Sequence, residues 1–326
     1  MPYKHCVVVT GGTANLGYYT SLNLAKDHPD QLIIIASRSD SNNAAETINK
    51  TLKQDNAIYL PLDLSDTGNV RAFAKRWESG SKQPLPPIEA LVLNAGLQFP
   101  GALSTTAEGV EKTFAIAHVG HALLFHLLCP YLVTGARVVV TSSGTHDPEQ
   151  KSGLPDANYT TAEELAHPPP SMIDVPGRLR YSTAKLCNVL WAYALVRKLS
   201  ERAPERQISV NVIDPGIMPG TGLAREGTWI ERFLWNTVFP RIIGLIRRFV
   251  ASNTHTPAES GWSQAQLALG ARGTGKYYEP SESGVKERKS SKASYEEDKQ
   301  ENLWRWTIDF LSNGDETEKA RFESFK

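Results

Sequence analysis

The sequence predicts an α/β fold in which helices cover both faces of a parallel, doubly wound sheet. Six short apolar runs alternate with segments of helical periodicity, and a glycine-rich turn follows the first run. Strands that are apolar on both faces are typical of parallel sheets buried between helices, and their alternation with helices defines the doubly wound architecture. We expect the 326 residues to form one domain, because α/β domains often exceed 200 residues.

The six apolar runs are the predicted strands. They cover residues 6–10, 32–36, 58–62, 90–93, 137–141 and 208–213. Helical patterns follow the first run at residues 18–27 and the second run up to residue 52. This order places the end of each strand next to a loop that leads into a helix.

Two regions interrupt this rhythm. Residues 144–178 are polar and proline-rich, and we interpret them as a long surface insertion. Residues 229–250 are apolar but contain four arginines, which predicts an amphipathic helix pair broken at Pro240, within a lid at about 225–250. Residues 282–299 are charged and expected to be solvated, and a helix with Trp304 and Trp306 is expected at about 301–312.

Charge and cysteine content exclude several classes of protein. Lysine plus arginine equals aspartate plus glutamate at 35 each, without the basic excess typical of nucleic-acid binding. Cys6, Cys129 and Cys187 are scattered, so we interpret them as buried apolar side chains in a reducing compartment. No signal peptide or membrane-spanning apolar run is visible, which predicts a cytoplasmic protein.

The turn after the first strand predicts a phosphate site. It reads Thr10-Gly11-Gly12-Thr13-Ala14-Asn15-Leu16-Gly17. Glycines permit a tight turn close to a pyrophosphate, and the following helix offers free N–H groups to the phosphates. The candidate cofactor-binding residues here are Gly11, Thr13, Asn15, Leu16 and Gly17.

The ends of the next three strands supply further cofactor candidates. The second ends in Ser37 and Arg38, where proteins that bind NAD usually carry an acidic residue. An arginine here favours NADP(H), because its guanidinium pairs with a ribose 2′-phosphate. Asp63, after the third strand, is expected to accept from the adenine amino group. The small residues of Asn94, Ala95 and Gly96 let the backbone pass beside the cofactor.

Tyr181 and Lys185 are four residues apart, which places them on one face of a helix. A nearby ammonium favours the phenolate, so we expect a lowered tyrosine pKa and a phenol that exchanges a proton near neutral pH. Ser142 and Ser143 lie at the end of the fifth strand, where a serine hydroxyl is expected to face the same crevice and hold a substrate oxygen. Pro215 and Gly216 follow the sixth strand, where a nicotinamide ring is expected.

Taken in this order, these motifs resemble the short-chain dehydrogenase/reductase family over roughly residues 5–280. The resemblance implies a Rossmann fold in which Ser143 orients the substrate and Tyr181 is the general acid/base. It also implies that Lys185 lowers the tyrosine pKa and binds the nicotinamide ribose. Residues 118–124, 181–188 and 275–278 are similar to the retinol dehydrogenases and protochlorophyllide reductases.

The chain departs from the family pattern at two positions. Asn15 stands where many relatives have glycine, and asparagine tolerates the unusual backbone angles of such a turn. Ala117 stands where the family usually has an asparagine thought to support a water in the proton relay. His118 and His121 follow it, but no third ligand accompanies them, so we interpret them as helix-packing residues rather than a metal site.

We therefore predict an NADP(H)-dependent oxidoreductase that reduces a carbonyl, or oxidises the alcohol, of a hydrophobic small molecule. One alternative is reduction of an activated C=C bond, and Ala117 motivates another, a nucleotide-binding protein without redox activity. The insertion is expected to shape the pocket rim and the stretch 229–250 to cover it, or instead to rest on a membrane surface. A homo-oligomer is also expected, and nucleic acid is not an expected partner.

Overall fold

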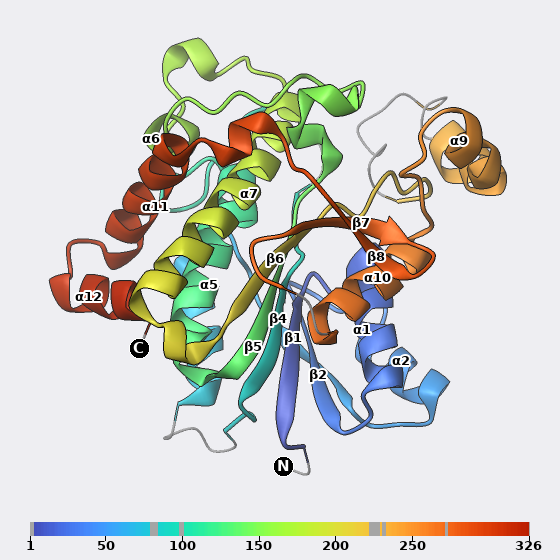
Figure 1. Cartoon of the computed structure of the whole chain (residues 1–326), viewed down its shortest axis with the longest axis horizontal. Helices are drawn as coiled ribbons and strands as arrows, with labels where there is room; N and C mark the ends of the chain where they lie inside the picture. Colours follow the sequence, from blue (N-terminus) through green and yellow to red (C-terminus); the bar gives the residue numbers. More distant parts are fainter. Residues whose placement is uncertain are drawn as a thin grey trace.

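The computed structural model describes residues 3–78, 84–97, 101–221, 229, 233–270 and 273–325. Its centre is an eight-stranded sheet of order β3-β2-β1-β4-β5-β6-β7-β8 (Figure 1). The strands are β1 (His5–Thr10), β2 (Gln31–Ser37), β3 (Ala57–Pro61), β4 (Ile88–Leu93), β5 (Leu132–Thr141), β6 (Ser209–Ile213), β7 (Tyr277–Ser281) and β8 (Gly284–Arg288). The predicted doubly wound α/β fold is confirmed.

Successive residues of a strand point to opposite faces of the sheet, and in this sheet both faces are apolar and covered by helices. Val7 and Val9 of β1 pack toward α1, α2 and α10, whereas Cys6 and Val8 pack toward α3, α5 and α7. The helices on the first face are α1 (Asn15–Asp27), α2 (Ala44–Leu52) and α10 (Pro257–Leu269). Those on the second face are α3 (Thr67–Ala74), α4 (Lys112–Phe114), α5 (Gly120–Leu128) and α7 (Gly177–Arg202).

Two C-terminal helices add a layer outside α7 and α5 (Figure 1). They are α11 (Glu297–Ser312) and α12 (Glu316–Ser324). The predicted helix at 301–312 thus begins four residues earlier, and the second helix was not predicted. Leu303, Trp304 and Phe322 are buried in this layer. Phe322 is the only buried residue of α12, so this helix has no apolar stripe from which the sequence could have predicted it.

The expectation that residues 282–299 are solvated holds for many of their charged side chains but not for the whole segment. Part of this segment is β8, which pairs antiparallel with β7 and extends the sheet. Val285, Ser291 and Ser294 are buried, and the Arg288 side chain is only 13% exposed. The sequence did not predict this strand, because its lysines and glutamates are typical of a solvated segment. In the structure these side chains are exposed at the edge of the sheet.

The interrupting regions also contain structure. The insertion holds α6 (Ala162–Ala166), whose two end residues are fully buried, together with several 3-10 turns. Residues 222–228 and 230–232, which include part of the predicted lid, lie outside the described residues. The rest of that stretch forms a π-helical turn (Leu234–Val238), a 3-10 turn containing Pro240 (Phe239–Ile242) and α9 (Ile243–Phe249).

Among the described residues, one continuous helical segment, Lys112–Tyr131, is long and apolar enough to cross a membrane by length and composition alone. However, 89% of its most apolar window is buried inside the fold. We therefore assign it to the core of the domain, where α5 packs against the sheet.

Candidate active site

The carboxyl ends of the parallel strands form one edge of the sheet (Figure 1). The predicted site residues other than Tyr181 and Lys185, which lie on α7, are found at or just after the ends of these strands. From β3 to β6 the edge carries Asp63, then Ser37 and Arg38, the glycine-rich turn, Asn94 to Gly96, Ser143, and finally Pro215 and Gly216. β1 and β4 are neighbours in the sheet although β2 and β3 separate them in sequence. Such a reversal of strand order is where open α/β sheets bind ligands.

The turn between β1 and α1 is shaped for close approach to an anion. Gly11 and Asn15 both adopt left-handed backbone angles, with φ of 68° and 47°. A Cβ at Gly17 would lie 2.3 Å from the Gly11 carbonyl oxygen, so no side chain fits there. Thr13 is half-buried in the turn, and Leu16 is buried below it. The N-cap residue of α1 provides no side-chain cap, which leaves its first-turn N–H groups available to phosphates.

Thr10 joins β1 to β4 at the point of reversal. Its hydroxyl oxygen accepts hydrogen bonds from the N–H groups of Asn94 and Ala95 at 2.8 and 3.0 Å. His121 Nδ1 donates to the carbonyl of Ala117 at 3.1 Å, so its Nε2 accepts from the Thr10 hydroxyl at 2.9 Å. The backbone that would run beside a cofactor is therefore fixed by hydrogen bonds.

The adenosine end contains an unsatisfied buried group. The Ser37 hydroxyl oxygen is buried and has no hydrogen-bond partner among the residues that the structure describes. Arg38 follows it and is exposed. Asp63 Oδ1 accepts from the backbone N–H and the hydroxyl of Ser65 at 2.9 and 2.6 Å, which fixes the carboxylate in the next loop. A buried hydroxyl without a partner is costly, and the oxygens of a bound nucleotide would satisfy it. These residues fit a dinucleotide.

Tyr181 and Lys185 lie one turn apart on α7, and Ser143 lies in the loop after β5. Lys185 Nζ is 5.7 Å from the centre of the Tyr181 ring and donates to the Thr141 carbonyl at 3.1 Å. The Ser142 hydroxyl donates to the Lys185 carbonyl at 2.8 Å, so this serine anchors the helix. Ser143 is the member of the pair whose hydroxyl bonds to Tyr181. The structure therefore brings the three predicted catalytic residues together.

The expected fall in the tyrosine pKa is not found. Burial raises the pKa of Tyr181 to about 12, because the hydrogen bond from Ser143, which lowers it, is outweighed by desolvation and by the charge of Asp214. Burial also lowers the pKa of Lys185 to about 8, against the attraction of Asp214. At neutral pH Tyr181 is thus a protonated phenol, and Lys185 is mostly an ammonium.

The loop after β6 places Pro215 and Gly216 at the far end of the row. Gly216 has φ of 78°, and a Cβ there would lie 2.6 Å from the Asn253 carbonyl oxygen. Its N–H donates to Asp214 Oδ1 at 3.0 Å, and the Pro215 carbonyl accepts from Ser260 at 2.7 Å. The loop is held rigidly from both sides, as a nicotinamide site requires.

The insertion borders a cavity of about 200 Å³ beside the first turns of α7. Its apolar lining includes Phe114, Leu165, Met172, Val175, Leu179 and Ala184. The cavity also contains a buried ion pair, with Arg180 Nε 3.3 Å from Glu111 Oε1. Leu179 and Ala184 flank Tyr181 in sequence, so the cavity and the tyrosine share the start of α7.

Ala117 lies in a π-helical turn, Ala115–Val119, and is buried without a polar side chain. His118 donates to the hydroxyl of Thr307 at 2.6 Å, and this bond joins the helix to α11. The His118 ring also packs against Trp191. Burial lowers the pKa of His118 to about 3 and that of His121 to about 4, so both are neutral packing residues. Within the described ranges, no three His, Cys, Asp or Glu side chains are grouped as metal ligands.

Sequence reasoning missed a layer of residues behind Ser143. His146 Nδ1 donates to the Ser143 carbonyl at 2.6 Å, and Arg288 of β8 lies 3.8 Å from Asp214. His146 had one available signal, its place three residues after the catalytic serine. Arg288 had no such signal, because the charged sequence of its strand is typical of a solvated segment.

The fold and the row of loops define a dinucleotide-binding α/β protein with a Ser-Tyr-Lys site. A family model described as short chain dehydrogenase matches residues 5–158. The chain is 31% identical to the WW domain-containing oxidoreductase of Drosophila melanogaster over 235 residues, 72% of this chain and 53% of that protein. It is 28% identical to human polyprenol dehydrogenase over 308 residues, 91% of this chain and 82% of that protein.

The chain belongs to the short-chain dehydrogenase/reductase family of oxidoreductases, whose typical cofactor is NAD(H) or NADP(H). It spans about half the length of the WW domain-containing oxidoreductases that it matches. Among solved structures, the angucycline C-6 ketoreductase LanV with bound NADP aligns with a TM-score of 0.57 and 19% identity, over 85% of this chain and 93% of that chain. This likeness concerns the fold alone.

Proposed function

We propose that this protein is an NADP(H)-dependent oxidoreductase that interconverts a carbonyl and an alcohol on a hydrophobic small molecule. The observation that carries the proposal is the convergence of Ser143, Tyr181 and Lys185 at the edge of the sheet beside the point of strand reversal. A module that only binds nucleotides has no need for this set of three.

The protonation of the site favours the direction of reduction. A carbonyl reduction needs a proton at the oxygen, and Tyr181 carries that proton because its pKa is about 12. Ser143 would hold the substrate oxygen, and the Lys185 ammonium would stabilise the phenolate that remains after proton transfer. A bound nicotinamide supplies the redox chemistry, the transfer of a hydride.

The preference for NADP(H) is argued from the end of β2. The orphaned hydroxyl of Ser37 and the exposed guanidinium of Arg38 occupy the place where an acidic residue would bind the ribose of NAD. An acid there would repel a 2′-phosphate, whereas Arg38 attracts it. The ketoreductase of similar fold has NADP bound, which is consistent with this choice.

The apolar lining of the cavity beside α7 supports a hydrophobic substrate. The relative named polyprenol dehydrogenase points in the same direction, because a polyprenol is a long apolar alcohol. We propose that the insertion accommodates an apolar portion of the substrate, while the polar group lies near Tyr181.

A test would follow nicotinamide absorbance with NADPH and NADH against apolar aldehydes, ketones and enones. We expect turnover with NADPH on aldehydes or ketones, and a fall of about 10²–10⁴-fold in Tyr181→Phe, the usual contribution of general acid/base catalysis. Exclusive turnover of enones would instead establish C=C reduction. Tight NADPH binding without turnover on any compound would favour the non-redox alternative, and Ala117→Asn would then be examined first.

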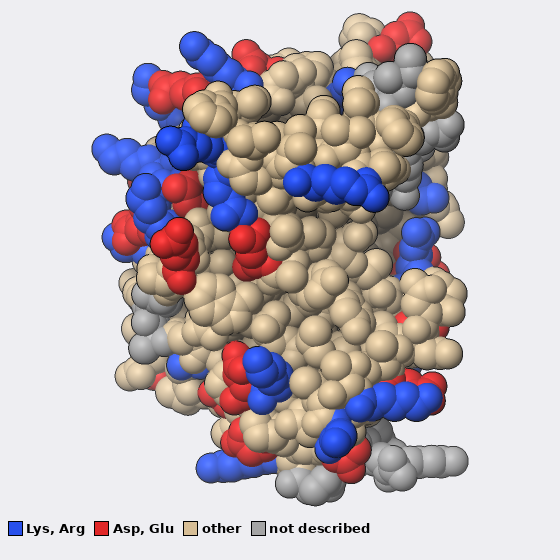
Figure 2. Space-filling view, turned by 90° about the vertical axis from the view of Figure 1, so that its right-hand side faces the viewer, with Lys and Arg blue, Asp and Glu red and all other residues tan. Residues whose placement is uncertain are grey.

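The exposed stretch around α9 supports a peripheral contact with an anionic lipid surface. Figure 2 shows the face that includes α9, where uncharged residues cover a broad area and side chains of both charges lie around it. Its exposed apolar side chains are Trp229 (71%), Phe233 (53%), Leu245 (58%), Phe249 (73%) and Val250 (80%). Arg241 and Arg248 lie among them, and residues 233–250 contain no acid. Apolar anchors with arginines suit a lipid interface, whereas a closed lid would bury them.

Cytoplasmic localisation with such a peripheral contact remains our prediction, as does a homo-oligomer.

A further inference from the structure

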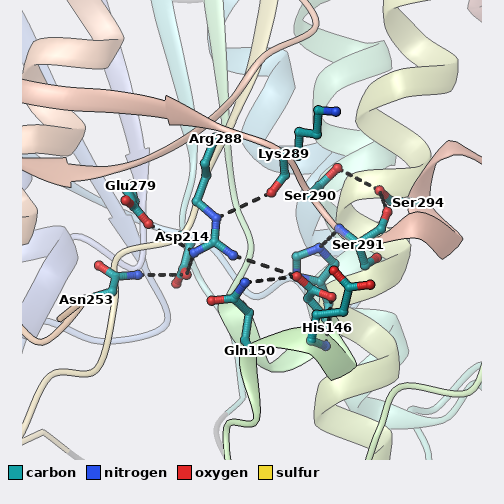
Figure 3. Close-up of polar contacts among 12 residues, drawn as sticks. His146, Gln150, Asp214, Asn253, Glu279, Arg288, Lys289, Ser290, Ser291 and Ser294 are labelled. Carbon is teal, nitrogen blue, oxygen red and sulfur yellow. Dashed lines mark hydrogen bonds and ion pairs between the residues drawn. The ribbon is translucent and has the colours of Figure 1, made fainter. Parts of the chain in front are cut away.

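An arginine of the last strand lies among three carboxylates behind the catalytic loop (Figure 3). Arg288 Nη1 is 3.0 Å from Glu279 Oε2 and 3.8 Å from Asp214 Oδ2, and its Nη2 is 3.8 Å from Asp147 Oδ2. These acids come from three places in the fold, namely the loop after β5, the loop after β6, and β7. One guanidinium therefore connects three segments that are distant in sequence.

Asp214 brings this cluster next to the catalytic residues. A Cβ at Gly144, the residue after Ser143, would lie 2.9 Å from Asp214 Oδ2. The same oxygen accepts from Asn253 Nδ2 at 2.9 Å, and Oδ1 accepts from the Gly216 N–H. Asp214 thus supports both the serine loop and the proposed nicotinamide loop, and its charge raises the pKa values of Tyr181 and Lys185.

The segment that follows Arg288 contacts His146 (Figure 3), and His146 in turn holds the backbone of Ser143. The Ser291 N–H donates to His146 Nε2 at 3.2 Å. The proton of His146 must then be on Nδ1, which donates to the Ser143 carbonyl at 2.6 Å. His146 is fully buried, and burial lowers its pKa, so this neutral tautomer persists at physiological pH.

The charge of Arg288 matters because the cluster is poorly solvated. The groups that face it are Asp147, Asp214 and Glu279, the ring of Tyr277 at 5.6 Å, His146 beside Asp147, and Lys286 on the outer side of Glu279 at 3.7 Å. Asp147 and Asp214 are only 7% and 4% exposed. Without the guanidinium, both would be buried anions with little compensation, and their field at the catalytic pair would increase.

We propose that Arg288 is a positioning residue of the proposed redox site, where it ties together the loops that carry Ser143 and Gly216 and offsets the negative charge of Asp214 beside Tyr181 and Lys185. The inference rests on the proposed function, since it assigns the role through those catalytic residues. Arg288 itself touches neither of them in the contacts described.

The first readout is the pH profile of kcat for alcohol oxidation with NADP⁺, the direction in which Tyr181 must lose its proton. The pKa of Tyr181 is already about 12, so the quantity to measure is kcat at pH values below it; we expect Arg288→Gln to lower kcat there by about 10-fold, the effect of an upward shift of one unit, less than the one to three units that a charge in direct contact produces. Arg288→Lys keeps the charge and should return the profile close to that of the wild type. Asp214→Asn combined with Arg288→Gln removes both charges and should cancel the upward shift.

Lys286→Gln is the matched control. Lys286 lies on the same strand and also faces Glu279, but its side chain is 71% exposed. We expect its pH profile to be unchanged. An equal shift in this variant would show that any cation on β8 has the same effect, and would overturn the specific role of Arg288.

A second readout needs no substrate, so it separates this inference from a failure of the proposed function. The unfolding free energy of Arg288→Gln is compared with that of the double variant Arg288→Gln/Lys185→Met across pH 7 to 10.5. The difference isolates the titration of Lys185, whose pKa is about 8 in the wild type. We expect its midpoint to move upward. An unmoved midpoint of the Lys185 titration would overturn the proposal.

Discussion

Replacing Lys185 by methionine is expected to stabilise the folded protein at neutral pH while removing its activity. Burial lowers the pKa of this ammonium from 10.5 to about 8, despite the attraction of Asp214. At 1.36 kcal/mol per pKa unit, the folded state bears a cost of about 3 kcal/mol for keeping Lys185 charged. Methionine fills a similar apolar volume without that charge. The Thr141 carbonyl, which loses its bond from Nζ, still accepts from Asn188 at 2.9 Å.

The sign of the pH dependence follows from the direction of the shift. Below pH 8 Lys185 is protonated in both folded and unfolded chains, so the wild type bears the full cost. Between pH 8 and 10.5 the folded protein loses this proton more readily, and the cost declines; above 10.5 it vanishes. The stability advantage of Lys185→Met should therefore shrink by about 3 kcal/mol between pH 7 and pH 10.5.

Urea unfolding followed by tryptophan fluorescence, at several pH values in this range, would measure the difference. Lys26→Met, at an exposed position on α1, is the control for the exchange of side chains itself. Parallel stability profiles for the wild type and Lys185→Met would refute the reasoning, because they would mean that Lys185 titrates alike in both states.

Three further predictions concern the cofactor and the surface. Arg38→Asp should weaken NADPH binding more than 10-fold relative to NADH, since it exchanges attraction for repulsion at the 2′-phosphate, and fluorescence titration with both cofactors measures this. Gly17→Ala should abolish binding of either cofactor, because its Cβ would lie 2.3 Å from the Gly11 carbonyl oxygen; retention of binding would exclude the assigned turn. Phe249→Glu should reduce sedimentation with vesicles containing phosphatidylserine but not alter NADPH affinity. Equal sedimentation of the wild type with neutral and anionic vesicles would contradict a role for Arg248 in this binding.

Local patterns were sufficient to predict the strands that hold the cofactor end of the site. β1, β2 and β3 end within one residue of the predicted limits, because each is a buried run bounded by a turn. The backbone of Asn15 could also be anticipated, since asparagine is among the few residues that adopt a positive φ without great strain. These features depend on residues that are neighbours in the sequence, so local sequence patterns are enough to predict them.

The ionisation of the site depends on neighbours in space and could not be obtained in the same way. Spacing alone placed Lys185 beside Tyr181 and suggested a lowered tyrosine pKa, but the depth of burial decides the outcome and the pKa rises instead. Asp214 was visible in the sequence only as part of a loop motif. Its effect on both catalytic groups appears once β6 and α7 are placed side by side.

Arg288 is a further residue whose environment depends on neighbours in space and could not be predicted from local sequence. The residue belongs to a strand whose charged sequence is typical of solvent, yet its guanidinium is enclosed by acids from three other segments. Without a compensating cation, the nearly buried carboxylates of Asp147 and Asp214 behind Ser143 would raise the cost of folding, and Asp214 would raise the proton affinity of Tyr181 further. The antiparallel hairpin of β7 and β8 is what delivers that cation. Under the role that we propose for Arg288, the last two strands contribute to the active site as well as to the sheet.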